Sequence, residues 1–501
     1  MKQIIIVILC VLNLQVLYAQ KQDYIWPLGI DWGLEEGIQA YRFDFNSSPF
    51  EVQEVDQAFE FRGNNGAICD PDGKLLLYTN GCLIADGNHN ILFDSLVLNE
   101  GEIKTQAIGD TDGYVGSQDL MLFPLDSVDS CFILIHKQRV LSSEGSIEVF
   151  LNQSSFCIGE SNVLIDSNLK VEGAPYVLAS FLTGITQHNS TNWWIVQPLS
   201  NDSLIMILQL DENGLSVDHY DNASVYFHAD EISAAGTAKF SPDGTKYAIY
   251  NEHNGLSLYD FDRTNGTLTH KQTIRIVEDS SFARFFGVEW SPNSRFLYTA
   301  SSTELHQVDT WEEDLTDGVR LVDVYNGTQD PFNTTFFLMS LGPDCRIYMC
   351  PTSSTFSYHV INSPDELGTA CDFVQNGIQL PRSSGVASFP NYPRFRVDEE
   401  DKCDPTIVSI FGEQVHYTRS LQAYPSPTTG TVTIQLPSQL AKAADIYITS
   451  TDGTVLSQQC MDAGESTSTI SLTSYPTGMY TISLVPQDKD NIVYSTKVSK
   501  I

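Results

Sequence analysis

The chain has 501 residues, of which 42% are hydrophobic and 11% aromatic, with 33 glycines and 21 prolines to supply turns. Its 63 acidic residues outnumber its 27 lysines and arginines and give a formal net charge of −36. This surplus argues against nucleic acid or an anionic lipid surface as a partner and favours a solvated acidic surface. The length exceeds that of one domain, and the lack of long helical periodicity favours an all-β fold.

The N-terminal residues have the pattern of a signal peptide. Lys2 precedes an apolar run, Ile4–Leu12, and the segment ends in a cleavage site at Ala19, before Gln20. The run is too short to span a bilayer, and no other stretch reaches the length of a transmembrane segment. We therefore expect residues 1–19 to be removed and the mature protein to pass through the periplasm to the outer cell surface or the extracellular space.

A short phrase recurs along the chain and marks a structural repeat. It reads FSPDG at Phe240–Gly244, WSPN at Trp290–Asn293, LGPD at Leu341–Asp344 and CDPDG at Cys69–Gly73. In each copy an apolar residue enters a Pro-Asp or Pro-Asn turn, and a run rich in β-forming residues leaves it. Three of the copies are spaced by about 50 residues, and strand pairs repeated at such a period predict stacked sheets.

Two weaker copies keep a polar turn at the same place, although its residues differ from the recurring phrase. Pro124–Ile135 (PLDSVDSCFILI) and Gln187–Val196 (QHNSTNWWIV) each place a polar turn before an aromatic or β-branched strand. With these copies, six units follow one another without room for a further domain between them. We expect Trp193 and Trp194, on the strand of the second copy, to pack in the core or between sheets rather than to form a platform for a sugar.

The two ends of the array supply the halves of one further unit. Gly385–Phe389 (GVASF) matches Gly236–Phe240 (GTAKF), and Gly37–Phe45 (GIQAYRFDF) matches the outer strand pair at Gly255–Asp262 (GLSLYDFD). A composite of the two halves closes a ring and removes the exposed edges of an open array. Residues 20–400 are therefore predicted to form a seven-bladed β-propeller closed by N- and C-terminal strands. Counts of six or eight blades stay open, because the two weaker copies can be counted otherwise.

The repeats also carry a family likeness. The phrases FSPDGTKYAIYN, GVEWSPNSRFLYTAS and LYDFDRTNG resemble the WD-like (WD40-like) and YVTN-type propeller repeats of bacterial secreted proteins. The combination of an early DPDGKLLLYTNG, a middle NWWIV and a closing SFPNYPRF before CDP is similar to an exported propeller module of Bacteroidetes. The likeness covers about residues 22–400. Propellers host enzymes, scaffolds and binding proteins alike, so it implies a fold and leaves the function open.

From Asp398 onward the composition changes. The run VDEEDKCDP is charged, and residues 401–420 are predicted to be a linker. Residues 421–501 alternate short strands with turns such as Asp452-Gly453, a pattern typical of a small immunoglobulin-like β-sandwich.

This last block resembles the type A C-terminal sorting domain of the type IX (Por) secretion system. The residues that carry the resemblance are Tyr424, Pro425, Pro427, Gly430, Asp452, Gly453, Gly478, Tyr480 and Lys497. Ser426 departs from the Asn that the family usually has, although the turn tolerates either residue. The resemblance implies passage across the outer membrane by the type IX secretion machinery, removal of the domain, and release or anchoring at the cell surface. An ordinary immunoglobulin-like module that binds another molecule is the alternative.

The cysteines suit an exported protein. Ten cysteines include Cys10 of the signal peptide, which leaves nine in the mature chain, so at least one is unpaired or pairs between chains. Two pairs are close enough in sequence to form disulfides, Cys69 with Cys82 and Cys371 with Cys403, although spacing does not fix connectivity. None of the spacings is that of a zinc or redox site.

Known catalytic motifs are absent from the sequence. It has no GxSxG elbow, HExxH pair, Gly-rich phosphate loop or sialidase box, and we therefore predict no catalytic residue and no resident cofactor. Asp110 and Asp112 resemble the start of a calcium loop but lack its later ligands, so an ordinary polar loop is the alternative. His188, His228 and His253 fall near strand ends, where propeller loops gather.

Without a catalytic motif, the sequence favours a cell-surface or released binding module whose propeller face takes an unidentified protein, peptide or glycan in a shallow central pocket. The alternative is an extracellular hydrolase or lyase acting on glycan or peptide at the same face. A structural component of adhesion or gliding is a third hypothesis. Carboxylates or histidines converging in one pocket would favour the enzyme, and a flat aromatic or polar face would favour the binding module.

Overall fold

The computed structural model describes residues 21–29, 40–47, 49–93, 98–101, 113–114, 116–125, 130–143, 145–228, 236–276, 285–384, 388–397, 417–436, 439, 443–450, 455–486 and 492–501. These residues are mostly strands, with a short α-helix, α2 (Leu315–Gly318), and a 3-10 helix, η2 (Gly368–Cys371). Within these ranges no helix has the length and apolar character that a bilayer crossing requires. The predicted signal peptide and the calcium candidates Asp110 and Asp112 lie outside the described residues.

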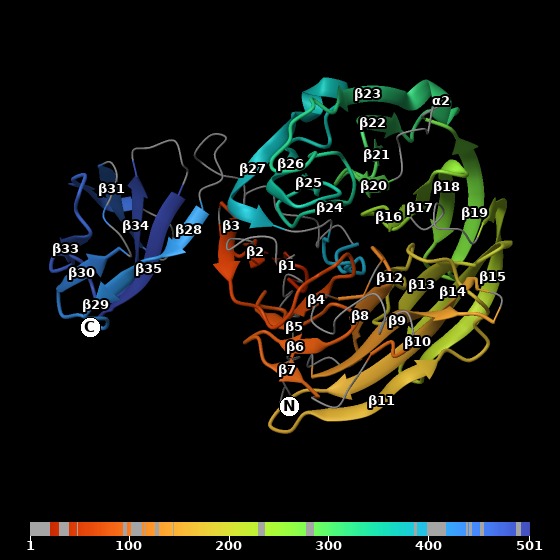
Figure 1. Ribbon diagram of the computed structural model, residues 1–501, viewed down its shortest axis with the longest axis horizontal. Coiled ribbons are helices and arrows are strands. Elements are labelled where there is room, and N and C mark those ends of the chain that lie inside the picture. Colours follow the sequence, from red (N-terminus) through yellow and green to blue (C-terminus); the bar gives the residue numbers. More distant parts are fainter. Residues whose placement is uncertain are drawn as a thin grey trace, which may run out of the picture.

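Six four-stranded antiparallel sheets, each made of consecutive strands, account for most of the described chain. The first three sheets are β4 (Gly66–Cys69), β5 (Leu75–Thr79), β6 (Ile84–Asp86) and β7 (Ile91–Leu92); β8 (Leu120–Pro124), β9 (Cys131–Leu141), β10 (Ile147–Cys157) and β11 (Val163–Lys170); and β12 (Thr183–Thr186), β13 (Trp193–Pro198), β14 (Asp202–Asp211) and β15 (Gly214–Phe227). The next three are β16 (Thr237–Phe240), β17 (Lys246–Asn251), β18 (Gly255–Asp262) and β19 (Thr267–Ile274); β20 (Phe286–Trp290), β21 (Phe296–Ser301), β22 (Glu304–Asp309) and β23 (Val319–Val324); and β24 (Met339–Leu341), β25 (Ile347–Met349), β26 (Thr355–Ile361) and β27 (Phe373–Ser384). The sheets surround a common centre with the first strand of each innermost (Figure 1), which is the architecture of a β-propeller.

The recurring sequence phrase forms the turn between the first and second strands of a sheet. Between β16 and β17, Asp243 Oδ1 accepts hydrogen bonds from Ser241 Oγ (2.5 Å) and from the Thr245 amide (3.0 Å). Between β20 and β21, Asn293 takes the same role and accepts from Ser291 Oγ (2.7 Å). A short polar side chain that bonds the backbone two residues on holds such a turn. Each of the six expected units, the two weaker copies included, corresponds to one of the sheets.

Large apolar side chains fill the space between neighbouring sheets. Trp290 of β20 is fully buried, and its indole donates a hydrogen bond to the carbonyl of Lys239 in the preceding sheet (3.2 Å). The ring of Trp193 lies edge-on to that of Phe123 in the neighbouring sheet, with centroids 5.2 Å apart, and Trp194 is buried as well. The expectation that Trp193 and Trp194 pack between sheets is confirmed, and burial of such rings supplies much of the sheet-to-sheet attraction.

A further group of three strands comes from the N-terminal residues. β1 (Ile25–Leu28) pairs with β2 (Ala40–Asp44), which pairs with β3 (Glu51–Val55). We expected an outer strand pair from residues 37–45, and β1, upstream of it, was not predicted. Its sequence IWPL is short, buried at every position and contains a proline, and it therefore gives neither the alternation nor the composition that marks a strand.

β1 runs in the opposite direction to β4, the first strand of the next sheet. The amide of Cys69, at the end of β4, donates to the carbonyl of Gln22, ahead of β1 (2.8 Å). The amide of Phe61, ahead of β4, donates to the carbonyl of Gly29, just after β1 (3.2 Å). β1 therefore has the direction of a second strand.

Phe389 connects the first and last parts of the ring. Its ring centroid lies 5.3 Å from that of Trp26 in β1 and 5.7 Å from that of Tyr358 in β26, and all three side chains are buried. We expected Gly385–Phe389 to form a strand here. Residues 385–387 lie outside the described part, and the rest of that segment is in no strand. In the described residues, closure of the ring therefore depends on side-chain packing rather than on a strand pair.

The disulfide between two described cysteines follows strand register rather than closeness in sequence. A disulfide joins Cys131 of β9 to Cys157 of β10, which lie opposite each other on the two strands. Cys69 and Cys371 are buried free thiols. Two expected disulfides are therefore wrong: Cys69 with Cys82, and Cys371 with Cys403. Register across a sheet places cysteines together at distances in sequence that spacing alone does not reveal.

The C-terminal residues form two sheets around a separate apolar core. One is β29 (Gln422–Tyr424), β30 (Thr431–Gln435) and β33 (Thr467–Ser471); the other contains β28 (Tyr417–Ser420), β35 (Ile492–Lys500), β34 (Gly478–Pro486), β31 (Ala444–Ser450) and β32 (Val455–Met461). Val432, Ile446 and Ile482 are fully buried in this core. Of the expected linker, residues 401–416 lie outside the described part, and residues 417–420 are strand β28, which pairs with β35 and, at one position, with β3.

Replacing Phe389 by alanine should destabilise the propeller strongly, because the change removes the ring that packs between β1 and β26. A buried Phe→Ala substitution costs about 3–5 kcal/mol, measured as the free energy of unfolding in urea. Phe332→Ala is the matched control, because Phe332 is 49% exposed. Its loss should stay below ~1 kcal/mol. Equal losses in the two variants would contradict closure through Phe389.

Candidate functional site

Residues 388–397 pass along the central channel and contact the innermost strands. The amide of Asn391 donates to the carbonyl of Asn65 (2.8 Å), and its Nδ2 donates to the carbonyls of Leu120 and Leu182 (3.0 Å each). Its Oδ1 accepts a hydrogen bond from Gln118 Nε2 (3.3 Å). These partners lie in or just before β4, β8 and β12, so the backbone amide and the buried side chain of one residue together fix the segment to three sheets.

Arg394 fixes the same segment to the sheets on the other side of the channel. Its amide donates to the carbonyl of Gly184 in β12 (2.8 Å), and its Nε donates to the carbonyl of Phe240 at the end of β16 (3.0 Å). Its Nη2 forms an ion pair with Glu289 in β20. The guanidinium thus bridges two further sheets with charge-assisted hydrogen bonds, which are stronger than neutral ones.

Glu289 is a buried carboxylate with a full set of partners. It accepts hydrogen bonds from the amides of Trp290 (2.9 Å) and Leu341 (3.2 Å) and pairs with Arg394 and, at 3.4 Å, with the ammonium of Lys239. Burial by itself raises the pKa of this carboxyl group, but the two cations and the two amides outweigh it and lower the pKa below its ordinary value. Glu289 is therefore an anion at neutral pH.

A second ion pair lies at the same end of the channel. Arg396 Nη2 is 2.6 Å from Asp23 Oδ2, and both side chains are mostly buried. Burial raises the pKa of Asp23, against the opposing attraction of Arg396. Arg396 Nη1 and Asp23 Oδ1 are buried without a hydrogen-bond partner among the described residues. Nearby, the hydroxyl of Tyr392 donates to the carbonyl of Ile25 (2.5 Å).

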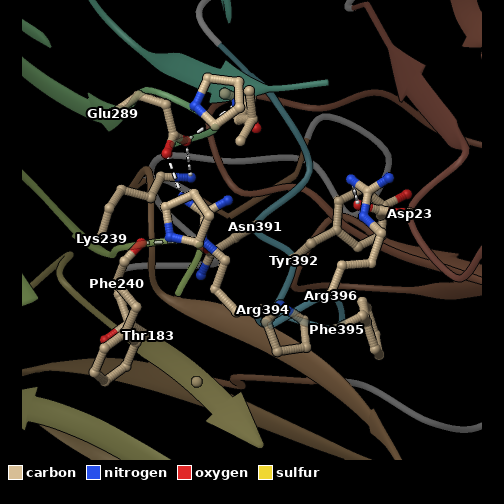
Figure 2. Close-up of a pocket in the computed structure, with 16 residues that line it drawn as sticks. Asp23, Thr183, Lys239, Phe240, Glu289, Asn391, Tyr392, Arg394, Phe395 and Arg396 are labelled. Carbon is tan, nitrogen blue, oxygen red and sulfur yellow. Dashed lines mark hydrogen bonds and ion pairs between the residues drawn. The ribbon is translucent and has the colours of Figure 1, made fainter. Parts of the chain in front are cut away.

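The two ion pairs line a single cavity, which we call the channel mouth. Figure 2 shows Lys239, Glu289 and Arg394 on one side of it and Asp23 with Arg396 on the other. The cavity has a volume of ≈ 50 Å³. Pockets for whole ligands usually measure about 300–1,000 Å³, and one water needs roughly 10–15 Å³, so only a group of a few atoms fits. The channel mouth is therefore too small for a whole glycan or peptide.

Another buried charge cluster lies toward the opposite end of the channel and serves the fold. Asp119 Oδ2 is 2.6 Å from Arg139 Nη2, and its Oδ1 is 3.3 Å from Lys137 Nζ. The ammonium of Lys137 also donates to the carbonyls of Leu178 (3.0 Å) and Ser180. Asp119 and Lys137 are engaged by protein groups, and Arg139 pairs with Asp119 while its Nε is buried without a hydrogen-bond partner among the described residues.

The histidines considered from the sequence are brought together only in part. The rings of His228 and His253 have centroids 5.1 Å apart, whereas Nε2 of His188 contacts Nδ2 of Asn189 (2.9 Å). Among the described residues, no group of three or more metal-ligating side chains occurs.

The residues of the channel mouth were not predicted, although part of their signal is in the repeat. Lys239 in GTAKF and Glu289 in GVEW occupy the same repeat position, one residue before the aromatic residue that enters the turn. Equivalent positions of consecutive units are neighbours around the ring, so opposite charges there indicate a pair between adjacent innermost strands. Arg394 lies outside the repeats and gives no such signal.

In the C-terminal domain, much of the predicted motif lies on the surface. Tyr424 ends β29 and is exposed, as are Pro425 and Pro427 in the turn that follows it and Lys497 on β35. Gly478 begins β34. Two motif residues lie outside the described part: Asp452 and Gly453.

Other residues of this domain are fixed by packing. A Cβ at Gly430 would lie 2.6 Å from Thr473 Cγ2, so a larger residue there requires the Thr473 side chain to move. Tyr480 is buried, and its hydroxyl donates to the carbonyl of Pro476 (2.6 Å). Lys500 is also buried and donates to the carbonyl of Thr473 (3.2 Å).

Comparison with known families concerns this C-terminal part. Residues 422–498 match the family described as the secretion system C-terminal sorting domain, and the match includes every residue of the predicted motif. The C-terminal block is a sorting domain. It directs export of the chain to the cell surface or the extracellular space, and the secretion machinery is its partner.

Relatives of the propeller are distant. Over 123 residues, the chain is 25% identical to the WD repeat-containing protein 26 homolog of Drosophila melanogaster. The matched region covers 23% of this chain and 19% of that protein, so the chain spans about a fifth of the relative's length. A functionally unknown protein from Desulfotomaculum acetoxidans (12% identity, TM-score 0.41) covers 74% of this chain and 99% of its own. The periplasmic gluconolactonase of Pseudomonas aeruginosa (13% identity, TM-score 0.38) covers 73% and 98%. Similarity at this level does not extend to function.

The ionised state of Glu289 should make stability depend on pH. Its folded-state pKa is lowered, so its contribution is present above the unfolded pKa of about 4.3 and is lost as pH falls through the lower folded value. Glu289→Gln should therefore cost about 3–5 kcal/mol at pH 7 in urea unfolding, and this difference from wild type should shrink below pH ~4. Glu312→Gln, at an exposed position, should follow the wild-type profile. A difference that does not change with pH would contradict the assignment.

Proposed function

We propose that this protein is a seven-bladed propeller, exported by the type IX machinery, that binds a ligand at the cell surface or in the medium. Six four-stranded sheets and the β1–β2–β3 group support seven blades. β1 has the direction of a second strand, which supports a seventh blade composed of N- and C-terminal parts of the propeller. The C-terminal domain, with two sheets around one core, is proposed to be immunoglobulin-like.

The observation that carries the proposal is the occupied channel with a small charged cavity at one end. Residues 388–397 fill the centre, so a ligand cannot enter the ring as it enters an open propeller channel. The channel mouth lies at the ends of β16 and β20, beside Pro242 and Pro292 of the strand-connecting turns. We therefore place binding on this face of the ring, with the channel mouth at its centre.

The chemistry of the channel mouth supports binding rather than turnover. A general acid or base must exchange a proton with substrate, which requires a carboxyl group free to do so. Glu289 is held as an anion by Arg394 and Lys239, and Asp23 is paired with Arg396. Both carboxylates are thus committed to the segment that closes the channel.

Arrays of glycans and peptides, together with a panel of glycosidase, lyase and peptidase substrates, test the proposal on the mature chain. We expect binding without turnover, because both carboxyl groups at the channel mouth are held in ion pairs with arginines. Pro292→Glu, at the rim, should weaken binding, whereas Leu321→Glu adds the same charge on the outer strand β23, where Leu321 is 51% exposed, and should not. If the wild-type chain turns over any of these substrates and Pro292→Glu abolishes that turnover, the proposal is overturned in favour of the hydrolase or lyase.

A further inference from the structure

The channel mouth concentrates positive charge in a strongly acidic protein. Of the 27 lysines and arginines in the chain, three line this cavity against two carboxylates: Lys239, Arg394, Arg396, Glu289 and Asp23. The side chains of the three cations are only 15%, 18% and 11% exposed. Charge that is not balanced in a poorly solvated site costs free energy, so the channel mouth favours one more negative charge.

Two of these cations also have hydrogen-bond donors to offer. The ammonium of Lys239 carries three N–H groups, and Glu289 Oε2, at 3.4 Å, is its single acceptor in the described part of the chain. Arg396 uses Nη2 for Asp23, while its Nη1 is buried without a partner within the described ranges. Buried donors without acceptors are costly, so these groups select a ligand rich in acceptor atoms.

We propose that the channel mouth binds a carboxylate group, held by Lys239 together with the guanidinium groups of Arg394 and Arg396. The inference rests on the proposed binding function and names the chemistry of the group that anchors the ligand. A carboxylate presents acceptors only, and its single charge equals the formal surplus of three cations over two carboxyl groups at the channel mouth. The remainder of a larger ligand lies outside, over the turns that contain Pro242 and Pro292.

Size and charge distinguish a carboxylate from other anions. The cavity has a volume of ≈ 50 Å³. Because a water-sized group occupies roughly 10–15 Å³ of such a volume, the cavity holds about four heavy atoms, and acetate has that size. A phosphate monoester carries a charge of about −1.5 to −2 at pH 7 and would leave negative charge unbalanced beside Glu289 and Asp23. The channel mouth should therefore prefer acetate to methyl phosphate.

Calorimetric titration of the mature full-length chain with sodium acetate, at ionic strength held constant with sodium chloride, tests the proposal. We expect saturable binding with a Kd of about 1–10 mM, as a four-atom ligand can reach. Acetamide has the same shape without the charge and should not bind. Methyl phosphate should bind at least about tenfold more weakly, because its second charge is not compensated.

Variants then place the acetate site. Lys239→Met should raise the Kd at least about tenfold through loss of a charge-assisted contact. Lys74→Met, at an exposed turn, should leave the Kd unchanged. The proposal is overturned if acetate binds the wild-type chain no better than acetamide does, and this test does not depend on whether Lys239→Met folds. It is also overturned if Lys239→Met folds and its Kd for acetate is unchanged. A glycan or peptide found on the arrays while acetate fails would refute only the carboxylate, whereas failure of both would also remove the proposed binding function.

Discussion

The ion pair between Glu289 and Arg394 is the interaction on which the centre of this molecule depends. Two charges are removed from water there, and their mutual attraction offsets the cost only because the backbone amides of two adjacent sheets and the ammonium of Lys239 complete the shell of Glu289. Each of those partners is fixed by a different innermost strand. The pair therefore requires the ring to be assembled, and it in turn holds residues 388–397 in the channel.

Closure, occupancy of the channel and the binding surface follow from one short segment. Phe389 packs between the first and last parts of the ring, Asn391 bonds three sheets, and Arg394 bonds two more. The same segment supplies two of the three cations of the channel mouth. It is also the last part of the propeller along the chain and precedes the sorting domain, so the residues that complete the ring are the last of the propeller to be made before the export signal.

Local chemistry explains what could be predicted from the sequence. The Pro-Asp turns around Asp243 and Asn293 are fixed by residues two apart, so their letters predict the hairpins and the repeat predicts the sheets. β1 was missed because its four buried residues lack alternation. Arg394 and the disulfide between Cys131 and Cys157 were missed for another reason, since both depend on which strands become neighbours, which no local pattern encodes. The equivalent repeat positions of Lys239 and Glu289 were the one feature of the sequence from which part of the site could have been predicted.

Hydrogen exchange of the backbone amides in residues 388–397, followed by mass spectrometry on the mature chain, tests this account most directly. The amides of Asn391 and Arg394 donate to the carbonyls of Asn65 and Gly184 inside the ring. If the segment is the element that closes the channel, these amides exchange only on global unfolding, as slowly as those of β16 and β20. Exchange of the segment at a rate far above that of the innermost strands would show that it opens on its own and would contradict the account.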